Sequence, residues 1–532
     1  MKTKIFLCTA LACSLITTSC SDFLTEDPKG KLTPTSFFAT QDELDMSVYS
    51  LYQKVAATQA YTNMQLPQWM GDDMTANSGS NKQAAAECDA FIPADNNKGV
   101  LECWSQHYTL IKAANYIILN AEKTPTSKEE IDIAVNQAKY WRAYCYFTLV
   151  RVFGPLPMNL TNEIDPLAPL TPVADVYAQI VKDLEDCESL PTSYSTQPRS
   201  MFGANTYITQ QAAKSTLAAV YMAMAGWPMK QNDCYAKAAV KAKEVIDGVK
   251  SGKYEYILEP EFKYVYAPSH NYTHETVVGI NYTEAFSWNQ SSQLTSSNLF
   301  ESVGNGWGDA FGEIRFWKNM PEGPRKDAIY NPKILLENKA GNELVDWWAK
   351  KDGVYFIPEV HPMFSIFTVG VGNTDYDYTK PASTDMINDH RHRVIRYAEV
   401  LLWYAEAQAR AEGTPNALAY ECINQVRNRA GLENLPAGMS GTAFADAALT
   451  EHGWEIAGYW CALVTRRADQ LRMDLLQKTF DERKKNDPIE VAPGVTVRET
   501  VLIPDKVTWQ GEKTIYAPYP STDASLNPNL VR

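Results

Sequence analysis

The sequence has no excess of positive charge. Its 49 Lys and Arg residues stand against 63 Asp and Glu, which gives a formal net charge of −14 at pH 7. Proteins that bind nucleic acid neutralise its phosphates with clustered Lys and Arg. A chain of this charge is therefore not expected to bind nucleic acid.

Paired cysteines and common catalytic motifs are also missing. The 10 cysteines are scattered without a C-x-x-C pair, which excludes the usual zinc-finger spacing and a disulfide-rich scaffold. Cys88 and Cys103 flank one polar loop of the chain, so a single disulfide there remains an alternative. The sequence contains no G-x-S-x-G, Walker or H-E-x-x-H motif, so no catalytic motif is identified.

Metal-binding patterns are weak. His390 and His392 form an H-x-H pair, but the arginines at 391 and 393 would repel a cation. The aspartate pairs at 72–73 and 375–377 lack the glycine-containing loop that is typical of calcium sites. We therefore expect no metal and no cofactor.

No apolar run beyond the N-terminus is long enough for a transmembrane helix. The N-terminus itself has two lysines, an apolar run over 5–16 and three small residues, followed by Cys20. This order is typical of a secretory signal peptide over 1–19. A cysteine directly after the small residues indicates a lipoprotein, in which several acyl chains on Cys20 hold the protein on a membrane. Residues 20–40 are then the lipid anchor and tether; the alternative is an ordinary secretory cleavage site with an accidental cysteine.

Helical periodicity dominates two parts of the chain, about 41–253 and 393–475. In the first part, apolar positions three or four apart predict helices over 42–57, 101–121, 129–154, 173–189, 207–226 and 233–250. In the second part, Gly413 is expected to end a helix, with Thr414 capping the next helix and Gly431 closing it. Ala407 and Ala411 lie four residues apart and are expected to share a helix face.

The fold class that follows is mainly α. Tight turns and Ala-rich helix pairs resemble tetratricopeptide (TPR) repeats, although no strict 34-residue period is present. Between them, about 254–392, Gly, Pro, Asn, Tyr and Trp become frequent, which predicts loops, short strands and short helices. Residues 41–532 are expected to form one domain with this irregular lobe inside it.

Several segments, in order, resemble the SusD/RagB family of Bacteroidetes surface lipoproteins, which capture nutrients and most often glycans. They are "CSDFLTEDP" (20–28), "YTLIKAANYII" (108–118), "AKYWRAYCYFTLVRVFGPLP" (138–157), "RYAEVLLWYAEAQARAEG" (396–413), "INQVRNRAGL" (423–432) and "YPSTDASLNPNLVR" (519–532). The chain departs from the family pattern at 451–472, where Glu451 is followed by His452.

The resemblance implies a right-handed superhelix of four TPR-like units with an irregular lobe that binds the ligand. It also implies a partner, a SusC-like TonB-dependent outer-membrane transporter. The protein would then be lipid-anchored in the outer membrane through Cys20 and face the cell exterior.

A sugar offers C–H faces and hydroxyl edges, so its binding site needs exposed aromatic planes and nearby polar side chains. In the irregular lobe the candidates are Trp288 with Asn289, Trp307 between two glycines, and Trp317. The family resemblance implies that the loop after the first helix also contributes to the ligand face, and here that loop includes Trp69, Asp72 and Asp73. For each Trp the alternative is a place in the core. A core position is expected for the tryptophans on helical patterns, namely Trp104, Trp141, Trp403, Trp454 and Trp460, and for one of Trp347 and Trp348.

Three functions are compatible with these features. The first is non-catalytic, cell-surface binding of oligosaccharide or polysaccharide and its delivery to the SusC-like transporter. The second is binding of peptides by the same fold, as the RagB branch of the family implies. The third is a surface glycoside hydrolase, which needs two carboxyl groups on either side of the scissile bond and whose geometry no sequence reveals.

Overall fold

The computed structural model describes residues 37–531, except 164, 284–287, 305 and 339–340. The predicted signal peptide, Cys20 and most of the predicted tether lie outside these residues. In the described part of the chain, no helix combines the length and the apolar character needed to cross a bilayer.

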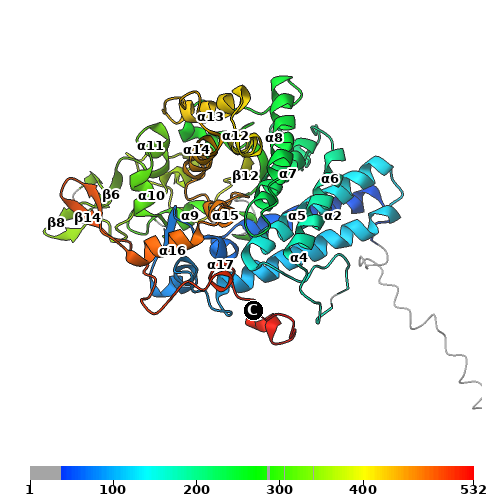
Figure 1. Ribbon diagram of the computed structural model, residues 1–532, viewed down its shortest axis with the longest axis horizontal. Coiled ribbons are helices and arrows are strands. Elements are labelled where there is room, and N and C mark those ends of the chain that lie inside the picture. Colours follow the sequence, from blue (N-terminus) through cyan, green and yellow to red (C-terminus); the bar gives the residue numbers. More distant parts are fainter. Residues whose placement is uncertain (1–36, 164, 284–287, 305, 339–340, 532) are drawn as a thin grey trace, which may run out of the picture.

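Helices of the first half of the chain pack side by side in chain order (Figure 1). α8 then packs against α12, which packs against α13 and α14, so the helices after the irregular lobe continue the same array. The helices of this array are α2 (Gln41–Gln59), α4 (Lys98–Asn120), α5 (Lys128–Phe153), α6 (Val173–Asp186), α7 (Gln210–Ala225), α8 (Cys234–Lys250), α12 (Tyr397–Glu412), α13 (Ala417–Arg429) and α14 (Gly441–Glu455). α15 (Arg466–Arg472) and α16 (Leu476–Lys485) follow, and α3 (Gln83–Asp89) lies beside α4.

Polar side chains fix where these helices begin. The Thr40 hydroxyl accepts a hydrogen bond from the Glu43 backbone N–H, and the Glu43 carboxylate accepts one from the Thr40 backbone N–H, forming a capping box for α2. Ser127 caps α5 in the same position, accepting from the backbone N–H of Glu130. Caps of this kind satisfy N–H groups that have no partner within the helix.

The predicted mainly α-helical fold is confirmed. The six helices predicted between 42 and 250 match α2 and α4 to α8, with ends that differ by a few residues. The handedness and the TPR-like detail of the array stay predictions.

One predicted cap is wrong. Gly413 does end α12 in the left-handed conformation (φ 72°), as expected. The next helix, however, begins later than predicted, and Asn416 rather than Thr414 caps it by accepting from the Ala419 backbone N–H. Asn is a strong capping residue, and it outcompetes the threonine that stands before Pro415.

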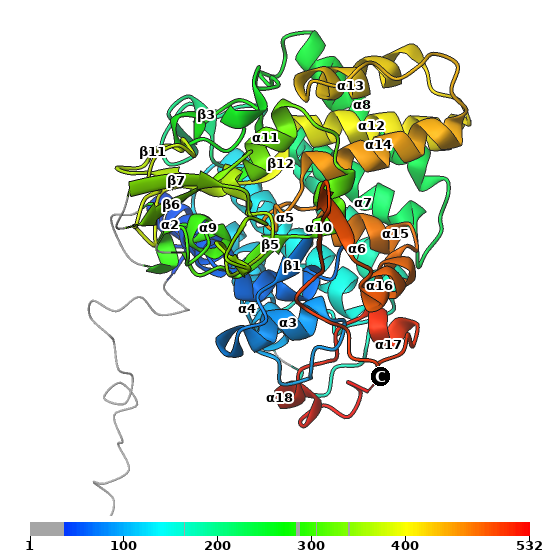
Figure 2. The ribbon, with the colours of Figure 1, turned by 90° about the vertical axis from the view of Figure 1, so that its left-hand side faces the viewer.

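Antiparallel two-stranded ladders and short helices form most of the lobe and also occur in segments that join the helices of the array. The ladders are β1 (Met74–Ala76) with β5 (Ala310–Gly312), β2 (Ser200–Met201) with β3 (Ala204–Asn205), β4 (Thr276–Ile280) with β12 (His392–Arg396), β6 (Ile334–Asn338) with β7 (Gly341–Val345), β8 (Lys350–Lys351) with β9 (Val354–Tyr355), β10 (Val369–Gly370) with β11 (Thr374–Asp375), and β13 (Ile489–Ala492) with β14 (Val495–Val497). The short helices are α9 (Leu294–Asn298), α10 (Ile314–Asn319), α11 (Pro324–Tyr330), α17 (Glu512–Ile515) and α18 (Ser521–Ala524). Figure 1 shows β6, β8 and β14 at the end of the molecule opposite α2 and α6. Figure 2 looks onto this end, where β6 and β7 run side by side.

The lobe takes in more of the chain than the predicted segment 254–392. Its buried clusters also include side chains from 66–91 and from 457–516. Four of the five tryptophans expected in the core are buried, namely Trp104, Trp141, Trp403 and Trp460. The fifth, Trp454, is only partly buried because it lines a pocket at the end of α14. Cys88 and Cys103 are both buried and free, so the alternative of a disulfide between them is not realised.

A buried network of ion pairs joins the helices to the lobe. Arg396, at the junction of β12 and α12, contacts Glu275 (2.9 Å) and Glu455 (2.7 Å). Arg429, near the end of α13, contacts the same two carboxylates. Arg325 of α11 contacts Glu455 at 3.2 Å and Glu451 at 2.7 Å. Because all of these side chains are at most 4% exposed, each charge depends on its partners.

A second buried network occupies the segment that departs from the family pattern. The His452 ring lies 2.5 Å from an Asp469 oxygen and 3.6 Å from a Glu399 oxygen. Arg472 contacts Asp469 (2.8 Å) and Glu406 (2.7 Å). Burial alone would lower the pKa of His452, but the two carboxylates outweigh it and raise that pKa to about 9.

The tight contacts of α12 give a test of the array. Ala407 is fully buried where α12 packs against its neighbours, whereas Ala411, expected on the same face, is exposed one turn later. We expect Ala407→Trp to overpack this contact and to lower the free energy of unfolding by roughly 1–3 kcal/mol. Urea denaturation of both variants measures it, with Ala411→Trp as the control that should match wild type. Equal stability of the two variants would contradict the observed packing.

The His452 network predicts a pH dependence of stability. Since its folded pKa of about 9 lies above the unfolded value of about 6.5, charged His452 stabilises the fold fully below pH ~6.5, and the contribution is lost as pH rises through about 9. The stability difference between wild type and His452→Gln should therefore shrink by on the order of 3 kcal/mol across this window. Urea denaturation of both proteins at several pH values from 6 to 10 measures it. A difference that is constant with pH would show that His452 is neutral in the folded protein.

Candidate functional site

Two of the predicted tryptophans lie together on the surface. Trp288, in the 3-10 turn η8 (Trp288–Gln290), is 48% exposed, and its ring stacks on that of Trp307 with centroids 6.0 Å apart and planes inclined by 25°. Tyr61 meets the Trp307 ring edge-on at 5.4 Å. We call Tyr61, Trp288 and Trp307 the aromatic cluster.

Glycines on both sides allow the Trp307 loop to fold tightly. A Cβ atom on Gly306 would lie 1.9 Å from the Leu299 carbonyl oxygen, and Gly308 adopts a positive φ of 54°. The Trp307 backbone N–H donates to the Ser296 carbonyl (2.6 Å), which fixes the loop on α9. The ring is thus presented by a constrained backbone.

The Trp288 turn is tied to the end of α2. The Gln293 side-chain N–H donates to the Trp288 carbonyl (3.0 Å), and the Gln293 backbone N–H donates to the Ala60 carbonyl (3.2 Å). Ala60 directly precedes Tyr61, so the hydrogen bond to Ala60 connects the Trp288 turn to the segment that carries Tyr61. The side chain of Asn289 lies outside the described part of the chain.

Polar groups lie beside the cluster. Lys82 and Asp309 form an ion pair, and Thr62 contacts the same aspartate at 3.5 Å. Burial, followed by the charge of Asp309, raises the pKa of Tyr61 to about 12. The Tyr61 hydroxyl therefore stays protonated at neutral pH and keeps its capacity to donate.

Trp317 belongs to a different group of rings. It packs against Trp347 (5.4 Å, 86°) and Trp348 (5.5 Å), and the Lys326 ammonium lies 4.5 Å from its ring centre. Trp347 is buried and Trp348 is half-buried, as expected for that pair. Trp317 is half-buried by these contacts and is not brought to the aromatic cluster.

The expectation that Trp69 offers an exposed plane is wrong. Its side chain is 1% exposed, within the buried cluster of the lobe. Asp73 is also buried: it accepts a hydrogen bond from the Gly458 backbone N–H (2.8 Å), and burial raises its pKa to about 7. The chain turns inward here to form β1, which takes both side chains away from the surface.

Asp72 lies instead at a charged pocket of about 280 Å³. Its two oxygens bind Arg466 at 2.7 and 3.0 Å. Glu313 and Glu499 also line this pocket, and burial raises the pKa of both. Each, however, accepts a backbone N–H from the start of α10, at 2.6 and 2.7 Å. The pair thus caps a helix, so a structural role accounts for these carboxyl groups.

The aromatic cluster is therefore the site that the structure assembles from the predicted residues. Stacked indoles present flat apolar surface, and the phenol beside them supplies a hydrogen-bonding group, whereas the Lys82–Asp309 pair is largely buried. Tyr61 and Lys82 were missed in the sequence because both lie far along the chain from the tryptophans. Asp309 is only two residues from Trp307, but its partner Lys82 lies 227 positions away, so no local pattern marked the ion pair. A tyrosine shortly after a predicted helix carries no signal that separates it from other surface tyrosines.

Two family models match the chain. The model described as "SusD family" matches residues 369–532, and the model described as "Starch-binding associating with outer membrane" matches residues 22–222. Neither description names an enzyme. A curated relative, SusD-like protein P2 of Formosa agariphila, is 26% identical over 451 residues, which are 81% of this chain and 82% of the relative.

Solved structures share the fold. A SusD homologue from Bacteroides thetaiotaomicron superposes with a TM-score of 0.71 at 19% identity, over 93% of this chain and 97% of that chain. A second solved structure, crystallised with a xylogluco-oligosaccharide, has a TM-score of 0.71 at 19% identity, over 92% of this chain and 97% of the other chain.

Proposed function

Because the chain belongs to the SusD/RagB family, we propose that it binds nutrient oligosaccharide or polysaccharide at the cell surface without cleaving it. It delivers the bound glycan to a SusC-like TonB-dependent transporter in the outer membrane. The name of one matching family, which states starch binding and association with the outer membrane, supports both the ligand class and the location.

The aromatic cluster carries this proposal. An indole that is 48% exposed and stacked on a second indole leaves apolar surface in water, which is unfavourable unless a ligand covers it. A pyranose ring has C–H faces that match such a plane, while its hydroxyls match the Tyr61 phenol beside it. A structural neighbour that was crystallised with a xylogluco-oligosaccharide supports a glycan ligand.

We propose binding without cleavage because the paired carboxyl groups of the charged pocket already have a structural role. Glu313 and Glu499 are the two pocket carboxyl groups whose pKa burial raises. Both accept hydrogen bonds from backbone N–H groups at the start of α10. A glycosidase needs its two carboxyl groups free to face a substrate. Binding of an extended peptide, the second candidate, would depend on backbone hydrogen bonds rather than on stacked indoles.

Alanine variants of the cluster test the ligand site. We expect Trp288→Ala and Trp307→Ala each to weaken binding by about 2 kcal/mol, the size of a hot-spot aromatic contribution. Trp317→Ala is the matched control: it should keep binding but melt early, because its ring packs against Trp347 and Trp348. Retention on affinity gels that contain starch, laminarin or xyloglucan measures binding, and far-UV circular dichroism with thermal melting measures the fold.

Three results of these measurements contradict the proposal. If both cluster variants keep full retention on a gel that binds wild type, the ligand site lies elsewhere. If wild type binds peptides and none of a broad glycan panel, the peptide-binding function replaces the glycan-binding one. If the glycan is shortened during incubation with wild type, the protein is a hydrolase.

Cys20→Ala tests the lipid anchor. The variant should be missing from the outer-membrane fraction in a strain that lacks the transporter partner, because Cys20 carries the acyl chains in this proposal. Ser21→Ala, which leaves the thiol in place, is the control and should fractionate as wild type. Unchanged membrane association of Cys20→Ala in that strain would contradict lipid anchoring.

A further inference from the structure

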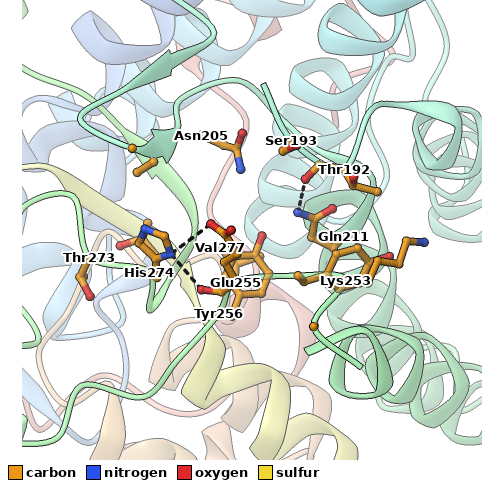
Figure 3. Close-up of a pocket in the computed structure, with 15 residues that line it drawn as sticks. Thr192, Ser193, Asn205, Gln211, Lys253, Glu255, Tyr256, Thr273, His274 and Val277 are labelled. Atoms are coloured by element: carbon orange, nitrogen blue, oxygen red, sulfur yellow. Dashed lines mark hydrogen bonds and ion pairs between the residues drawn. The ribbon is translucent and has the colours of Figure 1, made fainter. Parts of the chain in front are cut away.

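A separate cavity of about 130 Å³ lies where five segments of the chain meet (Figure 3). These are residues 192–193, the β2–β3 hairpin, the start of α7, the segment 252–256 after α8 and residues 273–277 around the start of β4. We call it the hairpin pocket. None of its lining residues belongs to the aromatic cluster or to the charged pocket.

Two buried polar atoms at this pocket have no hydrogen-bond partner in the described part of the chain. Gln211 is 2% exposed; its side-chain N–H donates to the Thr192 carbonyl (2.7 Å, Figure 3), but its Oε1 is unpaired. Thr276, 8% exposed, has an unpaired hydroxyl. Because leaving buried polar atoms unpaired is costly, both point to a polar occupant of the pocket.

An aromatic pair, exposed Phe202 and half-buried Tyr272, directly precedes two residues that line the pocket, Gly203 and Thr273. Phe202 is 77% exposed at the tip of the β2–β3 hairpin, where it adopts a positive φ of 50°. Turn positions of this kind favour Gly, Asn or Asp, and a bulky residue is disfavoured there. The Phe202 ring lies 4.7 Å from that of Tyr272. Folding does not account for a phenylalanine at this position.

The charged side chains around the pocket are of both signs. Lys253 and Glu255 line the exposed edge, and the His274 ring contacts the Glu255 carbonyl (3.0 Å) and lies 3.8 Å from its carboxylate (Figure 3). These groups balance one another, so they do not select a charged occupant.

We propose that the hairpin pocket binds one neutral pyranose unit, independently of the aromatic cluster. A dry cavity of about 150 Å³ accepts one benzene ring, so this cavity of about 130 Å³ admits no more than one sugar ring, with part of that ring left at the entrance. A sugar hydroxyl donates to Gln211 Oε1, and a second hydroxyl pairs with the Thr276 hydroxyl. The Phe202–Tyr272 pair covers a C–H face at the entrance. The site thus holds a branch or an end of a chain.

Saturation-transfer NMR on the purified Trp307→Ala protein tests this site with the aromatic cluster disabled. The probes are the methyl glycosides of glucose, galactose, mannose and xylose, with glucuronate as the charged comparison. At least one neutral glycoside should bind in this background. Adding Thr276→Val should weaken its binding about tenfold, the factor that corresponds to one hydrogen bond. The melting temperature of this double variant should equal or exceed that of Trp307→Ala, because valine has the shape of threonine without the unpaired hydroxyl.

Two further variants complete the design. Thr496→Val makes the same exchange at an exposed position of β14 and should bind as the background protein does. Phe202→Asn replaces the ring by a residue that tolerates positive φ, so it should fold normally and bind more weakly.

The proposal is overturned if no neutral glycoside binds to the Trp307→Ala protein. It is also overturned if Thr276→Val and Phe202→Asn both bind as tightly as the background, or if glucuronate alone binds. The proposed glycan-binding function fails in a different measurement, the retention of wild type on polysaccharide gels, so the two failures are distinguishable.

Discussion

The ion pairs around Glu455 are the contact on which the rest of the structure depends. This carboxylate lies at the end of α14 and contacts Arg325, Arg396 and Arg429, and the last two also contact Glu275. Burial opposes its ionisation, but the arginines outweigh burial and hold its pKa below the ordinary value. Removing one partner of a buried network costs about 3–5 kcal/mol, because the remaining charges are left in a medium that solvates them poorly. These ion pairs therefore hold the helices and the lobe in one arrangement.

The same ion pairs also hold β4, the strand on which both candidate sites depend. β4 begins one residue after Glu275 and pairs with β12, whose last residue is Arg396. Thr276, at its start, lines the hairpin pocket. The chain that leaves β4 leads to the turn of Trp288, which Gln293 ties to the end of α2. The hairpin pocket and the aromatic cluster are thus supported by one strand whose start is held by buried charges.

Local patterns in the sequence predict the helices well, because apolar spacing and caps are short-range signals. The same holds for Trp288 and Trp307, whose Ser- and Gly-rich surroundings set them apart from helical tryptophans. Trp69 has no such signal: the inward turn that buries it depends on Asp73 and on Gly458, 385 positions later. Asp72 likewise pairs with Arg466, which lies 394 positions away. Contacts of this range decide which loop residues remain at the surface, and no local pattern encodes them.

Each of the two candidate sites contains an aromatic side chain whose presence core packing does not explain. Trp141, Trp403 and Trp460 fill the core, and their burial alone accounts for their presence. Trp288 and Phe202 instead keep 48% and 77% of their surface in water, where they add little to the stability of the fold. At the hairpin pocket, two buried polar atoms also lack partners in the described chain. Exposed rings and unpaired buried polar atoms each cost free energy in the protein without ligand. A packing defect would be lined by apolar atoms alone. The hairpin pocket differs from such a defect because an exposed ring and unpaired polar atoms occur there together.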